Sequence, residues 1–393
     1  MTLVPPYDLL TPRKIVFGSG RRAEIDTLAA ALGVRAFLVT GSRTLESNGV
    51  VGEIVESLQS AGLEVVRLGS IDHEPEVGDV DRLVEEIRGH APSAGDFVIG
   101  LGGGSAIDLA KATAALATNR HSATVKDYLE GVGRGLQLTE DPLPMLAVPT
   151  TAGTGTEATK NAVISSYDPP FKKSLRSERM VPDIVLVDPE LAVTLPPATT
   201  AHTGMDAITQ LIESYMSRRA RPIPQALALQ GLESAVPAIA TAVEDGGNLE
   251  ARGCMAHAAL LSGIALANSG LGFAHGVAPA LGVHSRVPHG LACAVMLPTA
   301  MRVNRDVRLP ELARIGRLIT ARSWPSEGAA ADAGIERIVE LCERISIPST
   351  LTELGVRPEQ IPTIVASSRG NSMSANPREV SDAELTEILE SML

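Results

Sequence analysis

Two histidines and an aspartate have the side chains that commonly bind a divalent metal ion. His275 and His289 are each followed by glycine, and they lie in or just after an uncharged stretch, 253–285. Imidazoles in an apolar environment favour the neutral form, which binds metal. Asp206 lies in the first turn of a predicted helix, and Gln210 shares its face one turn later. Asp with two His is a common ligand set for Fe(II) or Zn²⁺, although Asp206 alone could equally serve the helix dipole.

A glycine cluster, GLGGGSAIDLAK at 100–111, follows a predicted strand and opens a predicted helix. Glycines let backbone amides approach a phosphate closely, and the helix N-terminus adds a positive dipole end. The cluster matches neither GxGxxG nor GxxxxGK[ST], and a tight strand-to-helix turn would also explain it. We expect Ser105 to cap the helix. The predicted cofactor-binding residues here are Gly102, Gly103, Gly104, Ser105 and Asp108.

A second loop, PTTAGTGTEAT at 149–159, contains five threonines and two glycines. Hydroxyls and amides of this kind suit ribose and phosphate oxygens, whereas the alternative is an ordinary polar loop. Because both loops follow strands of one predicted sheet, they point to a single nucleotide crevice at the carboxyl ends of the strands. Thr150, Thr151 and Thr154 are the candidate contacts.

The end of the strand at 36–40 bears on the choice of cofactor. NAD selectivity often uses an acidic residue after a strand to hold the ribose 2′-hydroxyl. Here the strand runs into Gly41, Ser42 and Arg43, and no acid follows directly. Gly41 and Ser42 are therefore predicted cofactor contacts, and NADP(H) is slightly preferred over NAD(H). The alternative is that Arg43 is simply solvated.

The elements that must position these side chains fall into two halves. In the first half, apolar runs alternate with helical patterns, which indicates a parallel sheet covered by helices. The predicted strands are 36–40, 64–68, 97–105, 144–151 and 183–189, and the helices are 45–61, 78–89 and 105–118. After 195–204 the pattern is helical, over 203–217, 225–244, 249–268, 290–304, 309–320, 330–345 and 380–391. We predict an α/β dinucleotide-binding domain over 1–195 and an all-helical metal- and substrate-binding domain over 196–393.

Composition excludes some partners. The 393 residues include 34 basic and 46 acidic side chains, a net charge of −12, and only 3% aromatic residues. Such a chain is a poor nucleic-acid ligand, because it neutralises few phosphates and offers few stacking surfaces. The stretch 253–285 contains three histidines and Pro279, so we expect a buried helix and not a membrane span. Three widely spaced cysteines and no recognisable signal peptide favour a reducing, cytoplasmic location.

The motifs GGGSAIDLAK, PTTAGTGTE, TGMDAITQLIESY and HGVAPALGVHSRVPHG, in this order, resemble the iron-containing (group III) alcohol dehydrogenases over essentially the whole chain. The resemblance implies a dehydroquinate synthase-like architecture, with an α/β dinucleotide-binding domain and an all-helical domain. It implies a nicotinamide in the cleft between them that faces a divalent metal. It also suggests a dimer or larger homo-oligomer.

The family's metal ligands are an Asp, a His four residues later, and two His fourteen residues apart. Asp206, His275 and His289 match three of these positions, and Gln210 occupies the second. An amide oxygen is a weaker and harder ligand than imidazole. A further family histidine near the substrate is replaced by Pro279, and His284 could substitute for it only if its side chain turns inward.

A family lysine near the nicotinamide corresponds to Lys173 or, one residue earlier, to Lys172, and Lys173 is the predicted cofactor contact.

These features predict an NAD(P)-dependent alcohol dehydrogenase that interconverts a small alcohol and its aldehyde or ketone. Asp206, His275 and His289 are the predicted catalytic residues, and they hold Fe(II) or Zn(II) with Gln210. The bound metal would act as a Lewis acid on the substrate oxygen. One alternative is a metal-independent, maleylacetate-reductase-like enzyme that binds an acidic carbonyl substrate through Arg176 and Arg286. Another is a non-redox member of the superfamily, a lyase-type cyclase or an inactive nucleotide-binding regulator.

Overall fold

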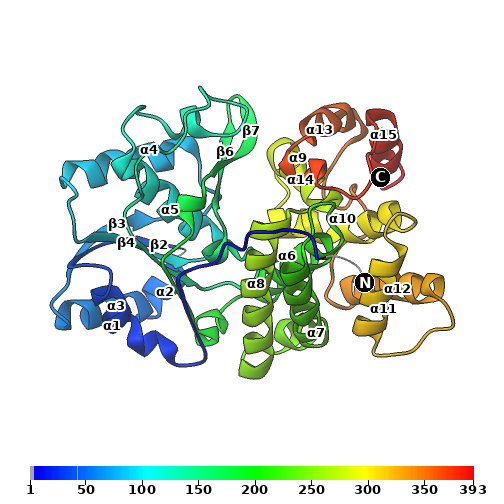
Figure 1. The fold of residues 1–393 in the computed structure, drawn as a ribbon, viewed down its shortest axis with the longest axis horizontal. Coiled ribbons are helices and arrows are strands. Elements are labelled where there is room, and N and C mark those ends of the chain that lie inside the picture. Colours follow the sequence, from blue (N-terminus) through cyan, green and yellow to red (C-terminus); the bar gives the residue numbers. More distant parts are fainter. Residues whose placement is uncertain (1–3, 42) are drawn as a thin grey trace. The chain divides into compact units, whose positions relative to one another are not determined.

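The computed structural model describes residues 4–41 and 43–393, and the chain forms two compact units. The α/β unit comprises Thr11–Thr151 and Thr156–Thr194. The helical unit comprises Ala152–Gly155 and Leu195–Leu393, together with the N-terminal segment up to Leu10. Figure 1 shows the strands in the first of these units and the long helices α6, α7 and α8 in the second.

The α/β unit is built on a sheet of six strands in which every neighbouring pair is parallel. The predicted α/β class with a parallel sheet and a helical second part is confirmed. The strand order is β1 (Lys14–Phe17), β8 (Ile184–Val187), β5 (Met145–Pro149), β4 (Asp96–Gly102), β2 (Arg35–Thr40) and β3 (Glu64–Ser70). The prediction missed β1 and a separate antiparallel pair, β6 (Asn161–Tyr167) and β7 (Pro170–Arg176).

Helices cover both faces of the sheet, which explains why its strands are apolar throughout. On one face, Phe37 and Val98 pack with α4 (Val77–Gly89) and α5 (Gly104–Thr118). On the other, Leu38 packs with α1 (Ile25–Ala30) and α3 (Val50–Ser60). The single helix predicted over 45–61 is in fact α2 (Arg43–Ser47) and α3, because Gly49 between them has a left-handed φ of 86°.

The glycines after β2 and β4 lie against each other. Strands β2 and β4 are neighbours in the sheet, but the chain leaves them in opposite directions. The strand that follows β2 in sequence, β3, lies on one side of this pair, and the strand that follows β4, β5, lies on the other. The strand order therefore reverses between β2 and β4. A Cβ at Gly102 would lie 2.8 Å from the Cα of Gly41, so position 102 has no room for a side chain, and a Cβ at Gly41 would lie only 3.1 Å from the Cα of Gly102. Helix α5 begins at Gly104 with Gly103 as its N-cap. The prediction that Ser105 caps this helix was therefore wrong, and Ser105 lies within its first turn.

The first long helix of the helical unit begins at Pro197, six residues before the predicted start at 203, so Asp206 lies well inside it and not in its first turn as predicted. The long helices otherwise follow the predicted segments. They are α6 (Pro197–Met216), α7 (Pro222–Glu244), α8 (Leu249–Ser269), α10 (His289–Asn304), α11 (Leu309–Thr320), α12 (Glu327–Arg344) and α15 (Asp382–Glu390). Asn248, Ser326 and Ser381 each cap a helix by accepting a hydrogen bond from the backbone amide three residues on. The prediction missed α13 (Ile361–Ser367) and α14 (Asn371–Ser374), and it did not separate α9 (Phe273–Ser285) from the buried helix expected over 253–285.

The uncharged stretch 253–285 is two helices and not one. Helices α8 and α9 meet at an angle of 103°, and Gly270, with φ 76°, ends α8. This bend matters for the site because it places the first turn of α9 beside α6. Helix α7 is long and apolar enough to cross a membrane by length and composition, a test that buried core helices also pass, and it packs on α6 and α8.

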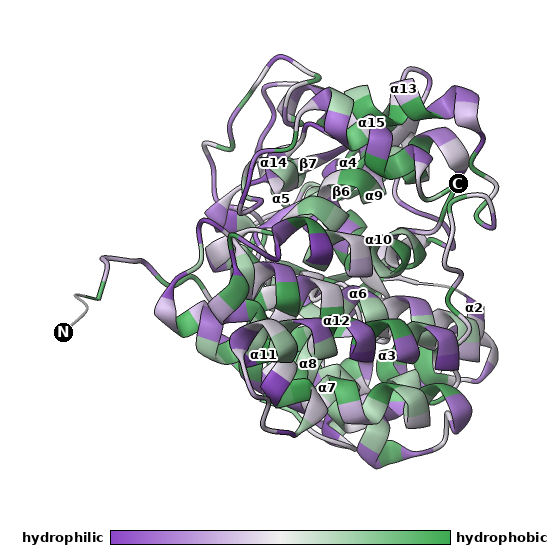
Figure 2. Ribbon diagram, turned by 90° about the vertical axis from the view of Figure 1, so that its right-hand side faces the viewer, coloured by the Kyte–Doolittle hydropathy of each residue, from purple (hydrophilic) through white to green (hydrophobic). Residues whose placement is uncertain are grey.

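Close helix contacts in this unit depend on small residues. Helices α11 and α12 approach so closely that a Cβ at Gly316 would collide with the carbonyl of Ala330. Figure 2 shows hydrophobic and hydrophilic residues alternating along these two helices, as expected for helices with one buried face. The N-terminal segment is held by Asn268 of α8, whose side chain bonds both the amide and the carbonyl of Leu10.

Candidate functional site

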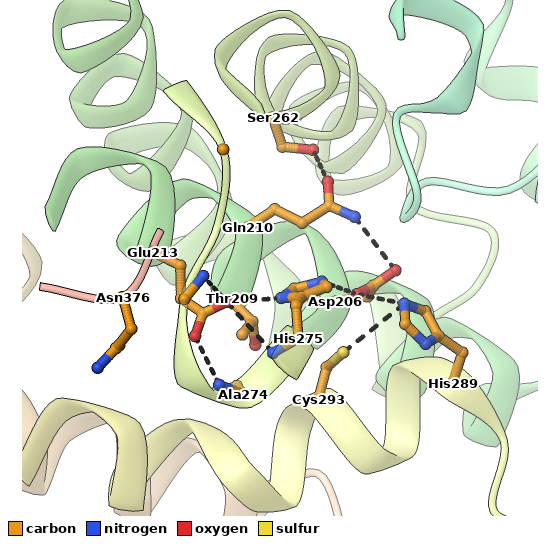
Figure 3. Close-up of polar contacts among 12 residues, drawn as sticks. Asp206, Thr209, Gln210, Glu213, Ser262, Ala274, His275, His289, Cys293 and Asn376 are labelled. Atoms are coloured by element: carbon orange, nitrogen blue, oxygen red, sulfur yellow. Dashed lines mark hydrogen bonds and ion pairs between the residues drawn. The ribbon is translucent and has the colours of Figure 1, made fainter. Parts of the chain in front are cut away.

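Four potential metal-binding side chains converge in the helical unit (Figure 3). Asp206 comes from α6, His275 from α9, and His289 and Cys293 from α10. One donor atom of each lies within 4.8 Å of the donor atoms of the other three. The His275 Nε2 is 3.1 Å and the His289 Nε2 is 3.9 Å from the Asp206 Oδ1. The structure thus brings together the three residues predicted to be catalytic and adds a cysteine that the sequence analysis did not select.

The first turns of two helices create this convergence. His289 is the first residue of α10 and His275 the third of α9, so both imidazoles project from helix starts toward α6. Gly290 lets α10 approach α6, because a Cβ there would lie 2.4 Å from the carbonyl oxygen of His202. Cys293 follows His289 by one helical turn and therefore shares its face. That His-x-x-x-Cys spacing is the signal that could have identified it.

Glu213 fixes the orientation of His275. Its buried carboxylate accepts a 2.7 Å hydrogen bond from the His275 Nδ1 and further bonds from the backbone amides of Gly272, Ala274 and His275. The negative charge thus lies at the N-terminus of α9, where the helix dipole stabilises it. Because Nδ1 donates to Glu213, Nε2 is left facing Asp206. Sequence analysis missed Glu213, although it lies seven residues after Asp206 on the same face of α6.

Gln210 contacts Asp206 from the opposite side of the cluster. Its amide nitrogen lies 3.4 Å from the Asp206 Oδ2, and its amide oxygen accepts a 2.7 Å hydrogen bond from the hydroxyl of Ser262 (Figure 3). The predicted role of Gln210 as a metal ligand stays a prediction. In the observed orientation the side chain bonds the carboxylate of Asp206.

Ionisation in the cluster is strongly coupled. Burial opposes charge on His275, but Cys293, Asp206 and Glu213 raise its pKa well above the usual range. Burial also opposes ionisation of Asp206, yet His289 and His275 hold its pKa below normal. Burial raises the pKa of the Cys293 thiol to about 12. A metal that binds here must therefore displace protons from His275 and from the Cys293 thiol, whereas Asp206 is already ionised.

The predicted nucleotide loops meet in the α/β unit. The amide of Thr150 donates to the carbonyl of Gly102 at 2.9 Å, and a Cβ at Gly103 would touch the side chain of Thr151. The glycine loop after β4 and the threonine loop after β5 thus lie side by side at the carboxyl ends of neighbouring strands. The backbone amides of Gly103 and Gly104 lie at the N-terminus of α5, a 15-residue helix. The positive end of the helix dipole at this point favours binding of an anion such as a phosphate.

Asp108 and Lys111 anchor the second half of the threonine loop. Asp108 accepts hydrogen bonds from the Thr156 hydroxyl and from the Val163 amide, the latter at 2.9 Å. The buried Lys111 ammonium donates to the Thr156 carbonyl at 2.8 Å and to the Thr159 hydroxyl at 3.0 Å. Both Asp108 carboxylate oxygens are thus engaged inside the protein, and its predicted cofactor contact stays a prediction.

The remaining predicted residues lie as follows. Thr154 belongs to the short segment Ala152–Gly155 of the helical unit, and Lys173 pairs with Ile164 across β6 and β7. Ser42 falls outside the described residues.

Three side chains considered as alternatives in the sequence analysis have other polar partners in the structure. His284 contacts the Ser367 hydroxyl at 2.8 Å, Lys172 pairs with Glu74 at 2.6 Å, and Arg176 pairs with Glu130 at 2.6 Å.

A parallel sheet with paired glycine and threonine loops, joined in one chain to helices that gather an aspartate and two histidines, is the plan of a dinucleotide-dependent oxidoreductase with a metal centre. Residues 12–189 match the family described as iron-containing alcohol dehydrogenase, and residues 200–393 match its C-terminal family. The chain belongs to the iron-containing alcohol dehydrogenase family. Membership implies a dinucleotide cofactor and a divalent metal.

Similar proteins act on small alcohols. The NADPH-dependent butanol dehydrogenase of Clostridium saccharobutylicum is 33% identical over 96% of each chain. The 1,3-propanediol dehydrogenase of Klebsiella pneumoniae is 34% identical over 97% of each chain. A crystal structure of 1,3-propanediol oxidoreductase has a TM-score of 0.92 and 32% identity, and the match covers 99% of this chain and 100% of the other.

Glu213→Gln should weaken metal binding. The variant removes the charge that fixes His275, and loss of such a partner typically costs about 10–100-fold in metal affinity. The measurement is Zn²⁺ affinity in competition with a chromophoric chelator. Glu233→Gln, an exposed change on α7, is the matched control. An unchanged affinity in the Glu213 variant would show that this carboxylate serves the fold alone.

Glu157 makes stability depend on pH. Burial raises its pKa to about 7, so between its ordinary pKa and pH 7 the folded state holds a proton that the unfolded state has lost. This group therefore lowers stability as pH rises through that window, by up to about 3 kcal/mol. Glu157→Gln should raise the urea midpoint relative to the parent protein more at pH 8 than at pH 5. The exposed Glu178→Gln should show no such difference, and equal effects of Glu157→Gln at both pH values would contradict the assignment.

Proposed function

We propose that the chain interconverts a small primary or secondary alcohol and its aldehyde or ketone by hydride transfer, with NADP(H) preferred and one divalent metal ion required. The observation that carries the proposal is the convergence of Asp206, His275 and His289 from three helices in a buried cluster. The names of the relatives, which include a butanol dehydrogenase, a 1,3-propanediol dehydrogenase and a lactaldehyde reductase, support a small alcohol or aldehyde as substrate.

The donor set fits a divalent metal. A carboxylate and two imidazoles suit Fe(II) or Zn²⁺, and their donor atoms already lie within 4.8 Å of one another. When bound, the metal supplies Lewis-acid stabilisation of negative charge on the substrate oxygen.

The protein's own residues prepare this centre. Glu213 holds His275 in the tautomer that presents Nε2, and Gln210 holds the Asp206 carboxylate. Burial of Asp206 and His275 keeps water from these donors, which strengthens their electrostatic interactions. In the α/β unit, the amides of Gly102, Gly103 and Gly104 and the start of α5 would hold the pyrophosphate.

The substrate proton must leave without the imidazole that the family resemblance implies at position 279. Pro279 stands inside α9, and His284 is turned to Ser367. We therefore assign the proton to a water molecule or to a ribose hydroxyl of the cofactor.

Metal-independent reduction is the second candidate, because Gln210 and Pro279 stand where the family has histidines. Of its two predicted anion-binding residues, Arg176 and Arg286, the first is already paired with Glu130, which weighs against it.

Metal removal tests the proposal. Protein purified anaerobically without chelator should contain about one Fe or Zn per chain and reduce small aldehydes with NADPH. His289→Ala should lose the metal and reduce activity by more than about 100-fold, beyond the usual effect of a residue that only supports a ligand. The exposed His121→Ala is the control. Metal-free protein that reduces an acidic carbonyl compound and ignores chelators would instead establish the metal-independent alternative.

Cofactor choice gives a separate test. Gly41 offers no carboxylate to the ribose, and Arg43 is exposed at the start of α2. We expect a higher kcat/KM with NADPH than with NADH. Arg43→Ala should lower the NADPH value by about 10-fold or more, since hydrogen bonds to charged groups contribute about 1.5–3 kcal/mol, and should leave the NADH value unchanged. Arg67→Ala is the control, and an NADH efficiency equal to or above that of NADPH would refute the preference.

A further inference from the structure

We propose that Cys293 is a fourth, sulfur ligand of the metal, and that the site of this chain therefore selects Zn²⁺ over Fe(II). The inference rests on the proposed metal site at Asp206, His275 and His289 and adds a ligand to it. A fourth ligand is needed because Gln210 stands where the resemblance implies the remaining histidine.

The position of the sulfur fits a coordination sphere. The Cys293 Sγ lies 3.8 Å from the His289 Nε2, and it belongs to the group of four donors within 4.8 Å. Tetrahedral zinc with Zn–N of about 2.0–2.1 Å and Zn–S of about 2.3 Å places neighbouring donors roughly 3.3–3.6 Å apart. The observed separations of 3.1, 3.8 and 3.9 Å bracket that range, so small side-chain movements suffice.

The surroundings of the thiol are polar, although the residue is fully buried. A buried cysteine usually acts as a small hydrophobic residue. Here the Sγ lies within 4.8 Å of donor atoms of Asp206 and His275, and Figure 3 shows it directed into the cluster beside His289. Helix α10 thus presents an imidazole and a thiol, one turn apart, to the same point.

Gln210 is the competing ligand, and its amide is engaged elsewhere. The amide oxygen bonds Ser262, and the amide nitrogen faces the Asp206 Oδ2. Turning the amide over would bring its oxygen 3.4 Å from a carboxylate oxygen, an arrangement that only a bound cation would favour. Cys293 needs no such reversal, because its one donor atom already faces the other ligands.

Sulfur changes which metal the site prefers. Thiolate is a soft ligand that favours zinc, whereas carboxylate and amide oxygens also suit harder ions. As the metal–sulfur bond forms, the thiol gives up its proton to solvent, as cysteine ligands generally do. The site then consists of one carboxylate, two imidazoles and one thiolate.

Cobalt substitution tests the ligand directly. Apoprotein loaded with Co²⁺ should show a sulfur-to-cobalt charge-transfer band in the near ultraviolet. Cys293→Ser should abolish that band, whereas Cys342→Ser, which removes another buried thiol, and Gln210→Ala should retain it. X-ray absorption of the unmodified zinc protein should show one sulfur at about 2.3 Å, which requires no variant to fold.

Metal competition tests the selectivity. Under anaerobic equilibration with equal Zn²⁺ and Fe(II), the parent protein should take up Zn²⁺, and Cys293→Ser should reduce the Zn²⁺-to-Fe(II) ratio by about tenfold or more. A ratio that Cys293→Ser leaves unchanged would overturn the selectivity.

The possible failures are distinct. Bound metal without a sulfur signal, with chelator-sensitive activity intact, would overturn the role of Cys293 and leave the proposed function standing. Parent protein that binds neither Co²⁺ nor Zn²⁺ would overturn both.

Discussion

The candidate metal centre depends on one buried carboxylate. Glu213 accepts hydrogen bonds from the first turn of α9 and from the His275 side chain, so it joins α6 to α9 and sets the direction of an imidazole at the same time. A buried charge is expensive unless it is fully hydrogen-bonded, and here the helix N-terminus provides the donors. The same carboxylate therefore both holds α9 against α6 and orients the His275 imidazole.

The α/β unit also contains buried charged side chains that are fully hydrogen-bonded and hold neighbouring segments together. The buried ammonium of Lys111 and the carboxylate of Asp108 hold the loop that follows β5, and both project from the helix whose first turn faces the expected phosphates. Burial lowers the pKa of Lys111, and Asp108 opposes that shift. One half of the GGGSAIDLAK motif is thus free to bind a ligand, while the other half holds the neighbouring loop in place.

The sequence predicted what depends on local pattern. The apolar runs that became β2 and β4 and the amphipathic helices were recognisable from local pattern. Residue types made Asp206, His275 and His289 candidate ligands, but it was the resemblance to the iron-containing alcohol dehydrogenases that grouped them in one site. The hairpin β6–β7 was missed because its strands mix polar and apolar residues without a clear period. Cys293 and Glu213 were missed for another reason. Each lies at helical spacing from a predicted ligand, but the spacing alone did not select them, because the contacts that give them a role arise only when α6, α9 and α10 pack.

The contact between Gly41 and Gly102 links two properties that are usually treated separately. A side chain at position 41 would meet the backbone of the glycine loop at 3.1 Å, so the loop would have to move by a few tenths of an ångström. Any residue placed there to distinguish one ribose from another would also displace the amides expected to hold the pyrophosphate. Redesigning this chain for a different nicotinamide cofactor would therefore require compensating changes in the glycine loop. A single substitution at position 41 that improved discrimination between NAD(H) and NADP(H) would lower the affinity for both.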